Sequence, residues 1–156
     1  LSMWIFTVIT YLIGSLIYFA MQRFSKRDDL ELICKVSGEV VHGKGIGRSV
    51  GMPTANVDYK EWPKGLICGV YSSTVNVNGE EFLAVTNVGS RPSIDNDKKI
   101  LIEAHILDFD KDIYGNIVTV NFYKYLRGVQ KFEGLEEVKK QVDKDIKYTM
   151  EIMGNM

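Results

Sequence analysis

Residues 69–88 read GVYSSTVNVNGEEFLAVTNV, two runs rich in β-branched and aromatic residues that meet at Asn78-Gly79. Both central positions of a type I′ turn need a positive φ angle, and Asn-Gly is a dipeptide that meets this need well. The stretch therefore predicts an antiparallel hairpin with strands at 69–77 and 81–88.

Similar runs on either side of this hairpin predict four more strands, at 31–41, 54–58, 99–107 and 117–126. One late helix is predicted at 135–153, and five apolar residues at three- and four-residue spacing give it a stripe for packing on the sheet: Leu135, Val138, Val142, Ile146 and Met150. Closure of six short strands removes exposed edges. We predict a mainly all-β fold, a six-stranded antiparallel barrel of Greek-key type with a C-terminal α-helix.

The composition is that of one ordinary globular domain. The 156 residues are 46% hydrophobic and 25% charged, with 19 basic against 20 acidic side chains. This balance lacks the excess of Lys and Arg that binds a phosphate polymer, so we expect a small-molecule ligand and no nucleic acid. Two cysteines, Cys34 and Cys68, are too few for a disulfide framework and indicate a reducing compartment.

The beginning of the chain differs from the rest. Residues 3–21 contain no charged side chain, and at about 1.5 Å per residue such a helix spans roughly 28 Å, close to the thickness of a bilayer's hydrocarbon core. Basic residues follow at Arg23, Lys26 and Arg27, which would hold the remainder in the cytoplasm. We therefore divide the chain into an apolar helical segment, 1–27, that is a candidate membrane anchor, and a barrel domain, 28–156. There are two alternatives for the apolar segment: it is a helix buried within the protein or covered by a partner, or it is non-native sequence.

A glycine-rich loop separates the first two predicted strands. Residues 43–56 read GKGIGRSVGMPTAN, with four glycines in nine residues. Glycines allow positive φ and close backbone approach, so successive N–H groups can hold phosphate oxygens, with charge from Lys44 and Arg48. Neither common phosphate-binding motif fits the spacing, and a purely structural loop is the alternative.

Two polar residues follow this loop at the start of a predicted strand. Thr54 and Asn56 alternate, so their side chains share one face, and their oxygens are hard neutral ligands that a phosphate-bound Mg²⁺ accepts. The alternative is that they only close a turn after Pro53.

Glu103 and His105 share one face of the strand at 99–107. A carboxylate in this apolar run is costly to bury, so Glu103 is either a member of a buried ion pair or a functional group. Glu103 and His105 could begin a transition-metal site, but no third ligand is evident, and we favour a structural or nucleotide-adjacent role for His105. His42 is expected at the loop surface.

The pattern from Gly43 to Asn56 resembles the signature of the riboflavin kinase (flavokinase) family. Further matches follow in family order and extend the resemblance over about 36–152: GVY at 69–71, VTNVGSRP at 85–92, EAHILDF at 103–109, IYG at 113–115, YLR at 125–127 and KF at 131–132. The resemblance implies phosphorylation of riboflavin to FMN by ATP with Mg²⁺. Separately from the resemblance, we expect the catalytic domain to be cytoplasmic and monomeric.

The resemblance also implies the roles of single residues. Glu103 would be the catalytic base for the riboflavin 5′-hydroxyl, while Thr54 and Asn56 would hold the metal. The residues implied to contact ATP are Gly43, Lys44, Gly45, Gly47, Arg48, Ile106, Asp108 and Tyr114, and those implied to contact the flavin are Arg127, Gln130 and Phe132. The chain departs from the family at Gly128-Val129-Gln130, where relatives carry a charged run.

Two alternatives accompany this interpretation. One is a non-catalytic module of the same fold that binds or senses flavin. The other is the separated kinase half of a two-activity FAD synthetase, which predicts an adenylyltransferase domain before the kinase. The first 30 residues are too short and too apolar for such a domain, so we expect the reaction to stop at FMN.

Overall fold

The computed structural model describes residues 12–18, 30–43, 45, 51–91 and 99–154. The chain divides into two units, Leu1–Glu31 and Leu32–Met156. Within the first, residues 12–18 are helical and their apolar side chains are exposed. Among the described helices, none is both long and apolar enough to cross a membrane. The rest of the predicted anchor, and the predicted boundary at residue 27, lie outside the described residues.

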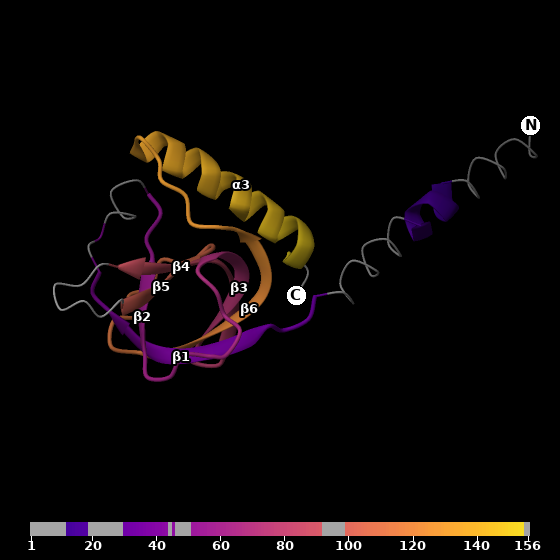
Figure 1. Ribbon diagram of the computed structural model, residues 1–156. Helices are drawn as coiled ribbons and strands as arrows, with labels where there is room; N and C mark the ends of the chain where they lie inside the picture. Colours follow the sequence, from indigo (N-terminus) through magenta and orange to yellow (C-terminus); the bar gives the residue numbers. More distant parts are fainter. Residues whose placement is uncertain (1–11, 19–29, 44, 46–50, 92–98, 155–156) are drawn as a thin grey trace, which may run out of the picture. The chain divides into compact units, whose positions relative to one another are not determined.

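The second unit is a closed barrel of six antiparallel strands followed by one helix (Figure 1). Neighbours around the barrel follow the order β1-β2-β5-β4-β3-β6. The elements are β1 (Cys34–Val41), β2 (Ala55–Tyr59), β3 (Gly69–Val77), β4 (Glu80–Arg91), β5 (Lys99–Ile106), β6 (Ile117–Arg127) and α3 (Leu135–Met153). The predicted fold class is confirmed. The predicted bounds were wrong mainly for β1, which begins three residues later, and for β4, which continues past residue 88 because its pairing with β5 extends to Arg91↔Lys99.

The hairpin at the centre of the prediction forms as expected. Asn78 has φ 52° and Gly79 has φ 91°, so both turn positions are left-handed. The Gly79 N–H also donates to Asn76 Oδ1 at 3.1 Å. Local turn chemistry thus sets the register of β3 against β4.

Alternate residues of each strand fill the inside of the barrel. Fully buried side chains among them include Val75, Val88, Ile102, Val120 and Phe122. Because side chains alternate across a strand, the intervening residues face outward. The outward face of β2, β5, β4 and β3 is therefore a second surface on which a site can form.

Helix α3 packs on the outside of the barrel, against β3 and β4. The predicted apolar stripe was partly wrong, because Leu135 and Met150 are about half exposed. The most buried positions are Asp145, Thr149 and Met153 instead. The two polar residues are buried because each has a partner on the barrel. Thr149 Oγ1 lies 2.7 Å from Ser72 Oγ, and Asp145 pairs with a basic residue of β6.

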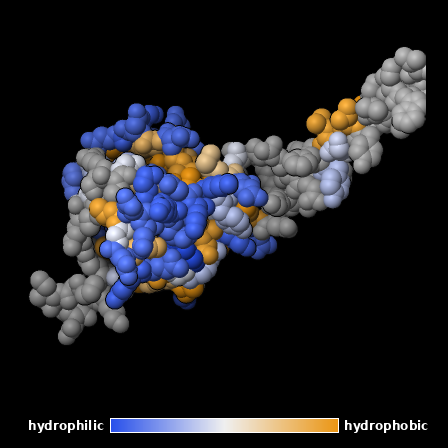
Figure 2. Space-filling view, turned by 90° about the horizontal axis from the view of Figure 1, so that it is seen from above, coloured by the Kyte–Doolittle hydropathy of each residue, from blue (hydrophilic) through white to orange (hydrophobic). Residues whose placement is uncertain are grey.

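The outward face of α3 carries the charged residues of the helix. In the view onto the side of the barrel that α3 covers, the surface is mostly hydrophilic (Figure 2). Exposed positions here include Glu136, Lys140 and Lys144. The helix thus turns its polar side to solvent and its partly apolar side toward the barrel, where a cavity lies beneath it.

Candidate active site

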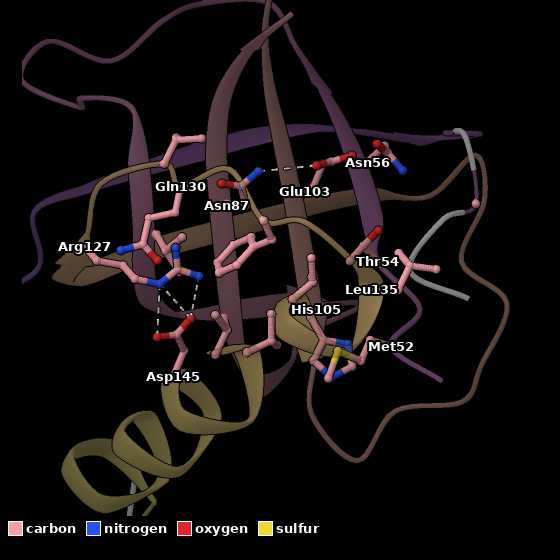
Figure 3. Close-up of a pocket in the computed structure, with 17 residues that line it drawn as sticks. Met52, Thr54, Asn56, Asn87, Glu103, His105, Arg127, Gln130, Leu135 and Asp145 are labelled. Atoms are coloured by element: carbon pink, nitrogen blue, oxygen red, sulfur yellow. Dashed lines mark hydrogen bonds and ion pairs between the residues drawn. The ribbon is translucent and has the colours of Figure 1, made fainter. Parts of the chain in front are cut away.

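The candidate site is built on one row of residues that crosses five strands. Strand register places Asn56 of β2 opposite Glu103 of β5, and Glu103 opposite Asn87 of β4. The row continues through Val70 of β3 to Arg127 of β6. All five line one cavity outside the barrel (Figure 3). Residues from positions 56 to 127 are thereby brought together by pairing alone.

This first cavity has a volume of about 380 Å³. The barrel wall forms one side, and α3 with the loop before it forms the other. The cavity brings together eight residues that the sequence analysis named as candidate functional residues: Gly45, Thr54, Asn56, Glu103, His105, Arg127, Gln130 and Phe132. Apolar residues line much of the remainder: Met52, Val70, Val85, Val129, Leu135, Val138 and Val142.

Glu103 is half-buried and stands second in the row, between Asn56 and Asn87. Its Oε2 accepts a hydrogen bond from Asn87 Nδ2 at 3.4 Å, and Asn56 lies on its other side. Within the described residues, its bonded neighbour is a neutral amide, which supports the functional interpretation over that of a buried ion pair. Asn87 was not singled out as a site residue. Asn87 belongs to the segment VTNVGSRP, which resembles the family, but the sequence does not show that it lies beside Glu103. The register of β4 against β5 shows this.

The glycine loop borders Asn56. A Cβ atom at Gly43 would overlap the Asn56 side-chain amide, so a larger residue there would displace that amide. Gly45 and Gly51 have φ 69° and 74°, as a loop that needs positive φ predicts. Lys44, Gly47 and Arg48 lie outside the described residues, so their predicted phosphate contacts stay predictions.

The two histidines occupy different positions, His105 in the lining of the first cavity and His42 at the surface. His105 Nδ1 lies 2.9 Å from the Pro53 carbonyl oxygen, which ties β5 to the residue before Thr54. His42 is exposed, and its ring stacks on Tyr114 with 3.7 Å between centroids. No group of three or more His, Cys, Asp or Glu side chains that could hold a metal occurs in the part of the chain that the structure describes. The exposed position of His42 agrees with the sequence interpretation, and the role of His105 stays a prediction.

A second cavity of about 300 Å³ lies next to the first. Ile106 and Tyr114, two of the expected ATP contacts, line it, together with residues 109–113. Thr54 lines both cavities and therefore stands where they meet. Asp108 lies at an exposed turn with φ 52° and is absent from the described lining of both cavities.

Arg127 stands at the end of β6 but is not solvated there. Its side chain is 16% exposed, and its Nη2 lies 2.8 Å from Oδ2 of Asp145, which is 6% exposed. The guanidinium also lies over the Phe132 ring, 5.9 Å from its centroid. Sequence reasoning missed Asp145, because an acid inside an amphipathic helix is ordinarily assigned to the solvent face.

Fold and site together define a β-barrel protein with a cavity on the outside of its barrel, beneath a helix. The family profile described as riboflavin kinase matches residues 30–153, which is most of the chain. The chain therefore belongs to the riboflavin kinase family.

Individual relatives agree with this assignment. A bifunctional riboflavin kinase/FMN adenylyltransferase of Pseudomonas fluorescens is 38% identical over 112 residues, covering 72% of this chain and 36% of the relative. A crystal structure described as a macrolide-efflux protein from Streptococcus pneumoniae matches with a TM-score of 0.69 at 31% identity, covering 74% of this chain and 38% of that one. Riboflavin kinase from Trypanosoma brucei has the same fold, with a TM-score of 0.53 at 22% identity over 77% of this chain and 79% of that one. The chain thus spans little more than a third of the first two proteins.

Proposed function

We propose that the chain transfers the γ-phosphate of ATP to the 5′-hydroxyl of riboflavin, giving FMN and ADP. The observation that carries this proposal is the position of Glu103 and Thr54. The carboxylate lies in the first cavity, and Thr54 lines both cavities at their junction. Riboflavin in the first cavity and ATP in the second would therefore meet beside a carboxylate and two neutral oxygens.

The chain's own residues supply a base and its orientation. Glu103 accepts the proton of the riboflavin 5′-hydroxyl as that oxygen forms a bond to the γ-phosphorus, and the bond from this phosphorus to the bridging oxygen of ADP breaks. Asn87 holds one carboxylate oxygen, which leaves the other for the hydroxyl. Phosphoryl transfer depends mainly on positioning and charge neutralisation, so few catalytic residues are required.

The residues near the junction suit a phosphate-bound Mg²⁺. Thr54 offers a hydroxyl and Asn56 an amide oxygen, both hard neutral donors on one face of the chain. Gly43 leaves room for the Asn56 amide, which a larger residue would displace. When bound, the ion would neutralise charge on the transferred phosphoryl group.

The first cavity suits a flat, uncharged ring system at its other end. Valines from the barrel and from α3 face one another across it. Arg127 and Phe132 add a guanidinium and an aromatic ring, both able to stack on a heteroaromatic ligand. These features favour riboflavin over a purely polar acceptor alcohol.

Incubation of the full chain with riboflavin, ATP and Mg²⁺, with chromatographic detection of FMN, tests the proposal. We expect the wild type to form FMN, and Glu103→Gln to bind riboflavin while forming FMN at least about a hundredfold more slowly. A wild type that binds flavin without phosphorylating it would instead support the non-catalytic flavin-binding module.

Attachment to a membrane through residues 3–21, with a cytoplasmic and monomeric catalytic domain, is a separate proposal. Its support is the uncharged segment followed by basic residues, and the exposed apolar side chains of the helix at 12–18: Leu12, Ile13, Leu16 and Ile17. We expect the full chain to sediment with membrane vesicles and a chain with Leu12, Ile13 and Leu16 changed to Ser to stay in the supernatant. Equal partitioning of both would overturn the proposal.

A further inference from the structure

Three segments meet around the guanidinium of Arg127, at the end of the cavity away from Thr54. Its Nε donates to both Asp145 carboxylate oxygens, at 3.3 and 3.1 Å, and Nη2 donates to Oδ2 at 2.8 Å. Nη1 donates to the Gly128 carbonyl oxygen at 3.3 Å. Gln141 Nε2 donates to Asp145 Oδ1 at 3.1 Å. The end of β6, the loop that follows it and α3 are thereby linked.

The pair determines where the side chain of Arg127 lies. An arginine has many rotamers, and a two-point contact with a carboxylate selects one of them. In this rotamer the guanidinium lies over Phe132, which belongs to the loop lining the cavity. Asp145 therefore positions the Arg127 guanidinium directly, and it positions the Phe132 ring indirectly through the contact of that ring with Arg127. Figure 3 shows Arg127 and Asp145 joined on the α3 side of the cavity.

Pairing also sets the charge of this end of the cavity. The Asp145 side chain is 6% exposed and that of Arg127 is 16%, so water screens neither charge well. Together the two side chains carry no net charge, whereas a guanidinium alone would be a partly buried cation. Among the described lining residues, Glu103 is then the acid without a cationic partner, and it lies near the other end of the row, next to Asn56.

From this geometry we infer that Asp145 is a positioning residue for the ring-bearing substrate. The inference rests on the proposed function, because it assigns the Arg127 end of the cavity to the flavin ring. Asp145 holds Arg127 and Phe132 in the arrangement that receives the ring. It has no part in the transfer step, which takes place at Glu103.

Steady-state kinetics of the full-length variant Asp145→Asn test this role, with riboflavin and ATP varied separately. Asn keeps the size of the side chain and removes its charge. We expect the KM for riboflavin to rise roughly 10- to 100-fold, the effect of losing a charged hydrogen-bonding partner. The KM for ATP and kcat should stay within about twofold. A purely structural role would reduce the active fraction, and hence the apparent kcat, and leave both KM values unchanged.

Asp143→Asn is the matched control, because Asp143 lies two positions earlier on α3 in an exposed pair with Lys139. All its kinetic constants should match the wild type. An unchanged riboflavin KM in folded Asp145→Asn would overturn the inference. Loss of one partner from a buried pair can unfold a protein. If circular dichroism shows that Asp145→Asn is unfolded, Asp145→Glu is measured instead. A riboflavin KM raised at least about threefold in Asp145→Glu would support the inference, and an unchanged riboflavin KM would overturn it. A wild type that forms no FMN would instead refute the proposed function.

Discussion

Asn56 and Glu103 are cross-strand neighbours on the outside of the barrel, although 47 positions separate them in the sequence. One residue belongs to the strand that follows the glycine loop, and the other is the single carboxylate of β5. Their proximity depends on register, because a slip of one residue would turn one of the two side chains into the barrel. The relative position of the Asn56 and Glu103 side chains is therefore set by the register of β2 against β5.

Asn87 should control the orientation of the Glu103 carboxylate. Asn87→Ala removes the 3.4 Å hydrogen bond to Oε2, so we expect kcat for FMN formation to fall on the order of tenfold, with both KM values little changed. Asn116→Ala is the control, because the hydrogen bonds of Asn116 to Val40 and Ile113 involve its backbone. An unchanged kcat in Asn87→Ala would show that the carboxylate is oriented by other contacts.

Gly43 should be required for the position of Asn56. A methyl group in Gly43→Ala would overlap the Asn56 amide, and a displacement of about 1 Å at a reacting centre can cost on the order of a hundredfold in rate. We expect a 10- to 100-fold loss of FMN formation in a chain that remains folded, with a higher Mg²⁺ requirement. Gly134→Ala is the control, because Gly134 has extended backbone and open space around it. Equal activity in both variants would refute the prediction.

The fold was more predictable from sequence than the site, because its signals are local. The dipeptide Asn78-Gly79 by itself predicts a turn with two positive φ angles, and both observed angles are positive. Runs of apolar and β-branched residues likewise indicate strands with no knowledge of their partners. The order β1-β2-β5-β4-β3-β6 is not local and could not be read in this way. It follows from the closure of the whole sheet.

The residues that sequence reasoning missed have roles defined by a distant partner. Asp145 looks like any solvent-facing acid of an amphipathic helix until Arg127 is placed beside it. Thr149 is buried for the same kind of reason, through Ser72. The predicted packing face of the helix therefore included Met150, which is half exposed, and left out Asp145 and Thr149, which are buried. A search for regularly spaced apolar residues does not detect a polar residue that is buried with a partner.

The hydroxyl pair of Ser72 and Thr149 should anchor α3 to the barrel. Both residues are fully buried, with 2.7 Å between the two oxygens. Ser72→Ala should lower the free energy of unfolding by about 1 to 3 kcal/mol, because the Thr149 hydroxyl is left buried without its partner. In the double variant Ser72→Ala/Thr149→Val, the loss of unfolding free energy should be smaller than the sum of the losses in the two single variants. Urea unfolding of both single variants and the double variant measures the coupling, and strict additivity would contradict it.

Tyr71 should make the protein less stable at alkaline pH. Burial raises the pKa of its hydroxyl above the ordinary value of 10.0, although the hydrogen bond to Ile67 lowers it in part. The unfolded chain thus releases this proton near pH 10 and the folded chain only at higher pH. In that interval the unfolded state binds fewer protons, so the free energy of unfolding falls as the pH rises through 10.

Tyr71→Phe should reduce this alkaline loss of stability. Burial also raises the pKa of Tyr59, so part of the decline should remain in the variant. At neutral pH the variant loses the 2.8 Å hydrogen bond to the Ile67 carbonyl oxygen, and we expect it to be less stable by about 1 kcal/mol. Urea unfolding at intervals between about pH 8 and 11 should give a shallower decline for Tyr71→Phe than for the wild type. Parallel curves would mean that the hydroxyl titrates equally in the folded and unfolded chains.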